Sequence, residues 1–360
     1  MGRRQTMAEE VMLDVRHLGK VFPIRRNFGE ILQRKPQEYV RAVEDVSFQI
    51  HKGETLGLVG ESGCGKSTLS RTILRLYKPD DGVIMFHSFG DLARTDGKKL
   101  KSARRQMQMV FQDPYSSLNP SMTIRQMFYE ILKVHHLCSN DQYEAVTRDI
   151  LEKVGMPDNA LDKYPSDFSG GQRQRICIAR ALIMKPELII ADEPVSALDM
   201  SVQAQIINLL AQLKEEMNLT MLFISHDLRV VQYISDRVMV MYLGRVMEMG
   251  RAEDIFREPA HPYTRILMDA APQIGEREDG RAEGIKGETP SPIHIPEGCP
   301  FHPRCPYADS ICSRKMPRVS TDEKGHMVRC HHPLVPGFHE RRAGEPDVFP
   351  EPVWGVMEES

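Results

Sequence analysis

The stretch of residues 60–68, which reads GESGCGKST, constrains this chain more than any other part of its sequence. It fits the P-loop pattern, in which two glycines bracket four residues and a lysine and a serine follow. Glycines let the backbone aim its N–H groups at phosphate oxygens, the lysine reaches the β- and γ-phosphates, and the serine hydroxyl takes a place on Mg²⁺. An apolar run at 56–59 predicts a buried strand before the loop, and apolar residues at helical spacing predict a helix after it. The sequence therefore predicts a nucleoside triphosphate site formed by Gly60, Glu61, Ser62, Gly63, Cys64, Gly65, Lys66, Ser67 and Thr68, with Ser67 on the metal.

Length and composition narrow the class of protein. At 360 residues the chain has room for one large domain, or for one domain with an appendage, and no internal repeat suggests a second nucleotide-binding module. Its net charge of -3 gives no sign of a nucleic-acid partner. It has no apolar run of about 18 residues to span a membrane and no apolar segment typical of a secretory signal. Seven unevenly placed cysteines favour a reducing, cytoplasmic compartment.

Two segments before the P-loop, at 11–15 and 43–48, alternate apolar and polar residues. They predict antiparallel strands on either side of a basic, irregular insertion at 25–37. Phe22 and Tyr39 are the aromatic residues closest to the P-loop strand, and either ring could stack on a nucleotide base. Ordinary packing on the sheet explains each of them equally well.

The middle of the chain alternates between polar and periodic segments. The polar stretch 87–101 predicts a loop, and residues 107–112 predict a strand that ends in Gln112. Residues 123–164 have helical periodicity and predict a separate helical lobe. Residues 169–173 open a further helix, and a glycine-rich helix N-terminus is a second potential phosphate site.

An acidic pair follows the apolar strand at 187–191. Asp192 directly after a buried strand suits a ligand of Mg²⁺ in a P-loop protein, and Glu193 beside it could act on the attacking water. Another apolar strand, at 220–224, is followed closely by His226.

The tail contains a cluster of cysteines. Residues 251–272 predict helix, 273–298 a linker rich in Gly, Glu and Pro, and the end from Gly337 an extended or disordered arm. Four thiolates suit a tetrahedral zinc ion or an iron–sulfur cluster, and the gaps of five, six and seventeen residues between them are wider than usual zinc pairs. Unligated thiols or disulfides are the alternative. The predicted ligands are Cys299, Cys305, Cys312 and Cys330.

Six motifs in order, GESGCGKST, VFQDP, FSGGQRQR, LIIADEP, SALD and ISHD, make residues 11–250 resemble the ATPase subunits of ABC transporters. Phe168 stands where that signature often begins with Leu, a similar apolar residue. The stretches VFQDPYSSLNP, HPYTRILMDAAP and CPFHPRC look like the dipeptide and oligopeptide importer branch. Members of that branch can carry a [4Fe–4S] cluster at such a set of cysteines, so the resemblance implies a cluster, with Zn²⁺ as the alternative.

The resemblance implies an α/β fold. Its P-loop NTPase core, the ABC ATPase, has an antiparallel β subdomain and a helical lobe, and a small Cys-rich C-terminal domain follows. The implied nucleotide-binding domain is 1–250 with its helical lobe at about 113–168. An oligopeptide-importer-type domain at 251–335 and an extended tail at 336–360 complete the chain.

The resemblance also implies roles for single residues. In the family, two ATPase subunits face each other head to tail, and ATP lies between the P-loop of one and the signature of the other. Ser169, Gly170, Gly171 and Gln172 would therefore serve the partner's nucleotide, and Ser196 and Asp199 would cross the dimer interface.

The remaining implied roles concern hydrolysis and the base. Asp192 would hold Mg²⁺, Glu193 would polarise the attacking water, and His226 would hold that water and the γ-phosphate in line. Gln112 would contact the γ-phosphate and Mg²⁺ and report to the membrane subunits. Phe22 is in the place of the aromatic residue that stacks on adenine, with Tyr39 as the second candidate.

The implied function is the ATP-driven import of di- and oligopeptides. The implied partners are two transmembrane permease subunits, a second, paralogous ATPase subunit and an extracytoplasmic peptide-binding protein, with no nucleic acid. The implied location is peripheral, on the cytoplasmic face of the inner or plasma membrane. Alternatives are the same role for a nickel chelate, an oligosaccharide or glutathione, and an ABC ATPase outside transport.

Overall fold

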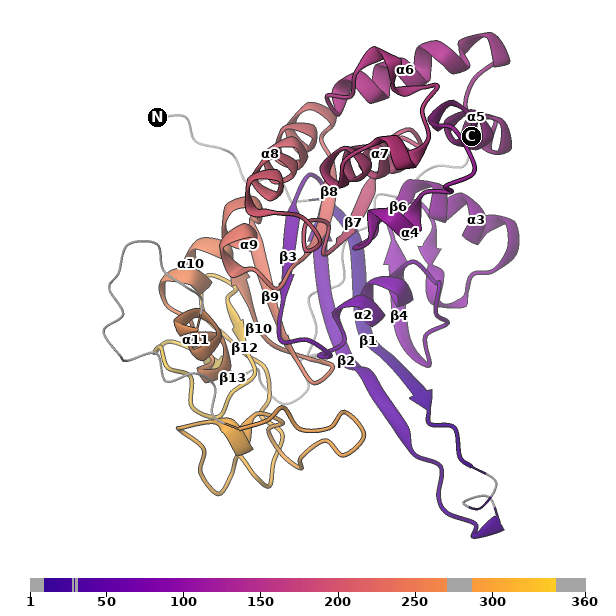
Figure 1. Ribbon diagram of the computed structural model, residues 1–360. Coiled ribbons are helices and arrows are strands. Elements are labelled where there is room, and N and C mark those ends of the chain that lie inside the picture. Colours follow the sequence, from indigo (N-terminus) through magenta and orange to yellow (C-terminus); the bar gives the residue numbers. More distant parts are fainter. Residues whose placement is uncertain (1–9, 28, 30–31, 271–286, 341–360) are drawn as a thin grey trace, which may run out of the picture. The chain divides into compact units, whose positions relative to one another are not determined.

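The computed structural model describes residues 10–27, 29, 32–270 and 287–340 (Figure 1). Their chain forms two compact units. The first contains the described parts of Met1–His51, Leu56–Thr95 and His226–Ser360, and the second contains Lys52–Thr55 and Asp96–Ser225.

The first unit contains a four-stranded antiparallel sheet in the order β2-β1-β4-β5. Two long strands, β1 and β2, pair from Val11 opposite His51 to Pro23 opposite Tyr39, as the alternating apolar segments predicted (Figure 1). The helix α2 packs on both of them. The strands and helix of this part are β1 (Val11–Pro23), β2 (Tyr39–His51), α2 (Lys66–Ile73), β4 (Asp81–Phe86) and β5 (Gly90–Asp91).

The P-loop strand β3 (Thr55–Val59) is fully buried and lies parallel to β9 (Arg237–Tyr242). The helix α9 (Leu228–Ile234) comes very close to it, because a Cβ on Gly57 would lie 2.5 Å from side-chain atoms of Val231 and Ser235. Glycine in the middle of this strand therefore makes room for the helix.

Further strands and helices of the first unit follow β9 in the chain. The strand β10 pairs antiparallel with β9, and β12, β11 and β13 follow in that order. Residues 287–298 contain neither helix nor strand, whereas the rest of the predicted linker and the tail from 341 lie outside the described residues. The elements are β10 (Arg245–Arg251), α10 (Ala252–Arg257), α11 (Pro262–Asp269), η5 (His302–Arg304), β11 (Ser320–Thr321), β12 (Met327–Val328) and β13 (His339–Glu340).

The second unit is built on three parallel strands, in the order β6-β7-β8, of which β7 and β8 are completely buried. Parallel strands buried on both faces read as continuous apolar runs, which is how both were predicted. The elements of this unit are α3 (Gly97–Gln106), β6 (Met107–Val110), α4 (Pro114–Ser117), α5 (Ile124–His135), η2 (Asn140–Gln142), α6 (Tyr143–Lys153), η3 (Asp158–Ala160), η4 (Pro165–Asp167), α7 (Gly170–Leu182), β7 (Leu188–Asp192), α8 (Met200–Met217) and β8 (Thr220–Ile224).

The prediction of a loop at 87–101 was wrong. This segment contains β5, a short 3₁₀ helix at Leu92–Arg94 and the first half of α3. Only Leu100 and Ala103 of α3 are buried, and lysines and arginines occupy much of the rest, so its apolar periodicity is too weak to read. Gln112 is also not part of a strand, because β6 ends at Val110.

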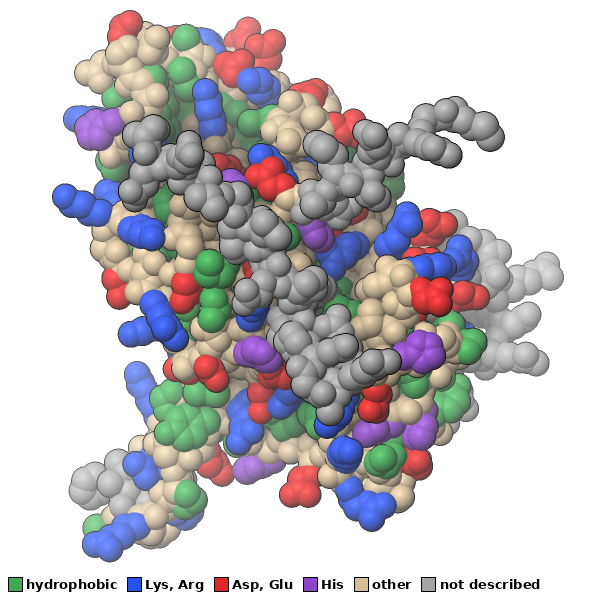
Figure 2. Space-filling view, turned by 180° about the vertical axis from the view of Figure 1, so that it is seen from behind, with side chains coloured by type: hydrophobic (Ala, Val, Ile, Leu, Met, Phe, Trp, Pro, Cys, Tyr) green, Lys and Arg blue, Asp and Glu red, His purple; other side chains and the backbone are tan. Residues whose placement is uncertain are grey.

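The surface has charges of both signs. Figure 2 shows lysine, arginine and acidic side chains interspersed on one face, with hydrophobic side chains there in small separate groups. Among the described residues, none of the helices combines the length and the hydrophobicity that crossing a bilayer requires.

Candidate functional site

The P-loop connects β3 to α2, and its two bracketing glycines are required by their neighbours. Gly60 and Gly65 have φ angles of 151° and 108°. A Cβ on Gly60 would lie 2.2 Å from the carbonyl oxygen of Met241, and one on Gly65 would lie 2.0 Å from that of Ala42. Any side chain at either position would displace the backbone, so the loop keeps its shape only with glycine there.

The lysine of the loop is folded back over it. The Nζ of Lys66 donates to the carbonyl oxygens of Gly60, at 2.7 Å, and Glu61, at 3.0 Å, and the side chain is buried. The helix α2 begins here with Gly65 as its N-cap and without a side-chain cap. Backbone N–H groups, the helix dipole and an ammonium group together attract an anion such as phosphate.

The other predicted loop residues lie around this lysine. Ser62 and Gly63 are exposed on the loop, and Cys64 is buried with its sulfur 3.8 Å from Nζ of Lys66. Ser67 and Thr68 follow in the first turn of α2.

Glu61 is held by three residues that sequence reasoning missed. Its carboxylate accepts two hydrogen bonds from Arg304, at 2.8 and 3.0 Å, and one from Thr289 at 2.6 Å. Its backbone N–H donates to the hydroxyl of Tyr263 at 2.9 Å. Burial alone would raise the pKa of Glu61, but the hydrogen bonds from Arg304 and Thr289 and the charges of Arg304 and Lys66 outweigh it and lower that pKa. No local pattern in the sequence connects these residues.

Phe22 and Tyr39 face different surfaces of the β1–β2 pair. The ring of Phe22 packs edge-on against Tyr77, with a centroid distance of 5.2 Å, just beyond the end of α2. Tyr39 instead lines a cavity of about 860 Å³ together with Val21 and Arg41. Successive side chains of a strand point to opposite faces. Because Val21 shares the cavity of Tyr39, the next residue, Phe22, points to the other face of the strand pair.

Gln112 and Glu193 lie together in the second unit. The side-chain amide of Gln112 donates to Oε2 of Glu193 at 3.2 Å. Glu193 follows Asp192, the buried last residue of β7, and has a φ of 49°, which is uncommon for a residue with a side chain. Its backbone N–H donates to the carbonyl of Ile224 in β8 at 3.0 Å. This conformation directs the Glu193 carboxylate toward Gln112.

The signature residues cap their own helix. Ser169 is the N-cap of α7, where its hydroxyl accepts from the N–H of Gln172, and the Gln172 side chain accepts in return from the N–H of Ser169. Between them, Gly170 and Gly171 form the first turn, and a Cβ on Gly171 would lie 2.4 Å from Val202 of α8.

Three further predicted residues lie between helices and strands. Asp199 is the N-cap of α8, and hydrogen bonds from Ser201 and the N–H of Val202 lower its pKa. Ser196 donates through its hydroxyl to the carbonyl of Glu193 at 3.2 Å. His226, two residues beyond the end of β8, has an exposed side chain.

The loop after Gln112 is joined to α7. The guanidinium of Arg173 lies 4.1 Å from the ring centroid of Tyr115, and Arg180 donates to the carbonyl of Ser117. Asp113 caps the short helix α4 in this loop. Sequence reasoning missed both arginines, although each stands at helical spacing on α7.

The four cysteines of the C-terminal cluster line one small cavity. Burial raises the pKa of Cys330 to about 12 and that of Cys299 to about 11, and the neighbouring thiols contribute to both increases. All seven cysteines of the chain are free thiols. Soft sulfur donors that converge on one cavity suit zinc or an iron–sulfur cluster.

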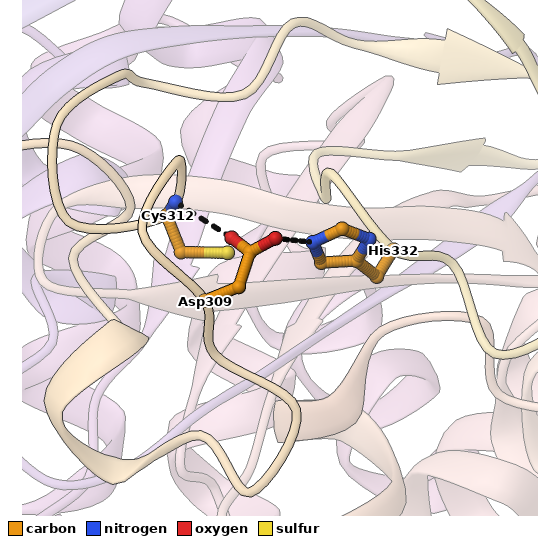
Figure 3. A group of neighbouring side chains, drawn as sticks. All are labelled: Asp309, Cys312 and His332. Atoms are coloured by element: carbon orange, nitrogen blue, oxygen red, sulfur yellow. Dashed lines mark hydrogen bonds and ion pairs between the residues drawn. The ribbon is translucent and has the colours of Figure 1, made fainter.

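A second group of possible ligands lies at the edge of this cavity (Figure 3). Asp309 accepts from the N–H of Cys312 at 3.2 Å and lies 3.1 Å from Nε2 of His332. Among the described residues these three form the only group of three or more His, Cys, Asp or Glu residues whose ligand atoms all lie within 4.8 Å of one another. Sequence reasoning missed Asp309 and His332.

Comparison with known proteins identifies the class. The model of the ABC transporter family matches residues 43–196. The dimeric structure of MJ0796, a bacterial ABC transporter cassette, superimposes with a TM-score of 0.58 at 27% identity, covering 67% of this chain and 99% of that one. CbiO1 from Clostridium perfringens, part of the transporter complex CbiONQ, has a TM-score of 0.59 at 28% identity over 69% and 92%. Fold and P-loop together define an ABC ATPase.

The C-terminal region narrows the family. Residues 247–312 match the model of the oligopeptide/dipeptide transporter C-terminal region. The oligopeptide transport ATP-binding protein AppF of Bacillus subtilis is 50% identical over 326 residues, covering 90% of this chain and 98% of AppF. OppF of Haemophilus influenzae, another oligopeptide transport ATP-binding protein, is 47% identical and covers 89% and 97%. The chain belongs to the family of ATP-binding subunits of oligopeptide and dipeptide ABC transporters, and the resemblance is confirmed.

Proposed function

We propose that this chain binds and hydrolyses ATP to energise the import of di- and oligopeptides by an ABC transporter. The observation that carries this proposal is the combination, in one chain, of a P-loop with the C-terminal region of oligopeptide transporters at residues 247–312. The relatives named for oligopeptide transport cover nearly the whole chain. Transport of a nickel chelate, an oligosaccharide or glutathione would use the same ATPase, and the C-terminal match favours peptides over these solutes.

Each of the predicted residues has a role in the proposed nucleotide site. Residues 60–68 hold the phosphates, with Lys66 neutralising charge and Ser67 and Gln112 on Mg²⁺. Asp192 holds the metal through water, and His226 keeps the γ-phosphate and attacking water in line. The contact between Gln112 and Glu193 supports the role of Glu193, because an amide donor fixes the carboxylate that accepts the proton of that water.

The assembly contains a second ATPase subunit, a paralogue, whose nucleotide is completed by the residues from Ser169 to Gln172 of this chain. The similarity to a dimeric cassette supports this arrangement. Two membrane subunits and an extracytoplasmic peptide-binding protein complete the transporter, so the chain is peripheral on the cytoplasmic face of the membrane. The loop from Asp113 to Pro120 contacts the membrane subunits.

The C-terminal cysteines hold a [4Fe–4S] cluster. Tetrahedral zinc with bonds of about 2.3 Å keeps its ligand atoms about 3.8 Å apart. The four sulfurs are more widely spread, since no three of these described cysteines meet even a 4.8 Å limit. The four thiols line a cavity of about 10 Å³, so the cluster would fit only with other rotamers of the cysteine side chains. The cluster supplies no chemistry to ATP hydrolysis; it cross-links a segment with a small apolar core.

The variant Glu193→Gln tests the proposed function in the assembled transporter. We expect ATP hydrolysis to fall by about 10²–10⁴-fold, the usual contribution of a positioned base, while ATP still binds and holds the dimer closed. Glu152→Gln, an exposed residue of α6, is the control and should hydrolyse ATP normally. Hydrolysis by Glu193→Gln at the wild-type rate would show that another group activates the water.

A further inference from the structure

Glu61 of the P-loop is anchored at three points by the first unit. Its N–H donates to Tyr263 in α11, its carbonyl accepts from Lys66, and its carboxylate is paired with Arg304. A residue bound through its N–H, its carbonyl and its side chain has little freedom to turn. Two of the three anchors come from the region after residue 260, which is more than 200 residues away in the sequence.

The ion pair between Arg304 and Glu61 has the bidentate, shielded geometry of the stronger ion pairs in proteins. Both oxygens of the carboxylate are engaged, and the Arg304 and Glu61 side chains are only 6% and 18% exposed. The same guanidinium also donates to the hydroxyl of Tyr242 at 3.2 Å. Bidentate, shielded pairs of arginine with carboxylate fix geometry as well as contributing energy.

The position of Arg304 is determined by residues 299–330, the segment that contains the four clustered cysteines and is called the cysteine segment here. Arg304 ends the 3₁₀ helix η5 and stands between Phe301 and Cys305. Phe301 is fully buried against the rings of Tyr242 and Tyr263, at centroid distances of 5.3 and 5.2 Å. This packing places η5, and with it the guanidinium, beside the P-loop.

We propose that Arg304 is a positioning residue for the P-loop: through Glu61, the cysteine segment holds the loop in the conformation that receives the phosphates. This inference rests on the proposed function, because it assumes that nucleotide binds at residues 60–68. Because Arg304 acts through Glu61 in this proposal, its effect is on the affinity for any nucleotide with a β-phosphate. The hydrolysis step at saturating ATP does not depend on it.

The test measures nucleotide affinity of the full chain carrying Arg304→Gln. We expect the Kd for ATP and the Kd for ADP to rise by the same factor, about tenfold, with kcat at saturating ATP within about twofold of wild type. Hydrogen exchange at residues 58–68 should become faster in the nucleotide-free protein. The Kd values of Arg304→Lys should fall between those of wild type and Arg304→Gln, because lysine keeps the charge but not the bidentate geometry.

Glu61→Gln provides a second route, since it breaks the same pair and leaves the cysteine segment intact. Both single variants remove the same ion pair. The double variant should therefore bind nucleotide no more weakly than the weaker-binding of the two single variants. The control is Arg318→Gln, an exposed arginine of the same segment, which should bind nucleotide as wild type does. Metal content and Tm of each variant distinguish a repositioned loop from a misfolded segment.

Several outcomes would overturn the proposal. Unchanged Kd values in Arg304→Gln would show that the loop holds its shape without this pair, and additive effects in the double variant would show that the two residues act separately. If Arg304→Gln bound ATP more weakly but ADP as tightly as wild type, Arg304 would instead be a ligand of the γ-phosphate. Lys66→Ala separates this inference from the proposed function: normal nucleotide binding in that variant would refute the P-loop site itself.

Discussion

At the scale of single residues, the two aromatic candidates for adenine stacking differ in where their side chains point. Phe22 packs against Tyr77, close to the end of the P-loop helix, while Tyr39 lines a cavity on the other face of the β1–β2 pair and is 46% exposed. The Nζ of Lys20 lies 5.1 Å from the Phe22 centroid. The resemblance assigns stacking on the base to Phe22, and the different surroundings of the two rings allow each to be tested separately.

We therefore expect Phe22→Ala to raise the Kd for ATP by roughly tenfold, since stacking on an aromatic ring contributes about 1–3 kcal/mol per base. Tyr39→Ala is the matched control and should leave the affinity unchanged. Equilibrium binding of a fluorescent ATP analogue checks both. If neither variant changes the affinity, backbone and aliphatic contacts hold the adenine; if only Tyr39→Ala does, the assignment is reversed.

At the scale of secondary-structure elements, the loop that follows Gln112 is connected mechanically to the signature helix. Tyr115, which is 59% exposed, is held over Arg173 of α7, and Arg180 of α7 bonds the carbonyl of Ser117. A movement of α7, whose first turn is expected to contact the partner's nucleotide, would therefore displace the loop that is expected to contact the membrane subunits.

Tyr115→Ala should reduce the peptide transported per ATP hydrolysed by about two- to fivefold, because an exposed cation–π contact contributes about 0.5–1 kcal/mol. ATP binding should stay at the wild-type level. Tyr115→Phe keeps the ring and is expected to transport normally. The measurement is parallel uptake and ATPase activity in vesicles containing the complete transporter; a constant ratio in Tyr115→Ala would show that the contact plays no part in coupling.

At the scale of the whole molecule, the C-terminal segment has little regular structure of its own. Its strands β11, β12 and β13 have two residues each, and the cysteines line its small inner cavity. A segment with so little regular structure and so small a core would gain stability from the proposed metal centre.

Anaerobically purified protein should accordingly be brown, with broad absorbance near ~400 nm and about four irons per chain. Removal of the iron should lower the Tm, and Cys305→Ser should do so more than Cys138→Ser, which changes a cysteine outside the cluster. Elemental analysis decides between the alternatives. One zinc per chain would replace the cluster with a zinc site, and the absence of any metal would refute both.

The sequence by itself determined the features whose chemistry is contiguous in the chain. The P-loop, the strand before it and the helix after it could be predicted because adjacent residues supply the glycines, the lysine and the apolar spacing. The buried strands β7 and β8 were predicted for the same reason. The short helix α3 was missed because only Leu100 and Ala103 are buried, and a pattern of two residues has no readable period.

Only the tertiary structure decided which distant residues meet. Glu61 pairs with Arg304 across 243 positions and Gln112 with Glu193 across 81, and neither distance follows a helix or strand period. The sequence makes Phe22 the first candidate for adenine stacking and Tyr39 the second, but only the pairing register of β1 with β2 assigns them to opposite faces. Such contacts depend on how whole elements pack, because hydrogen bonds between side chains require a direction and a distance that residue types alone do not specify.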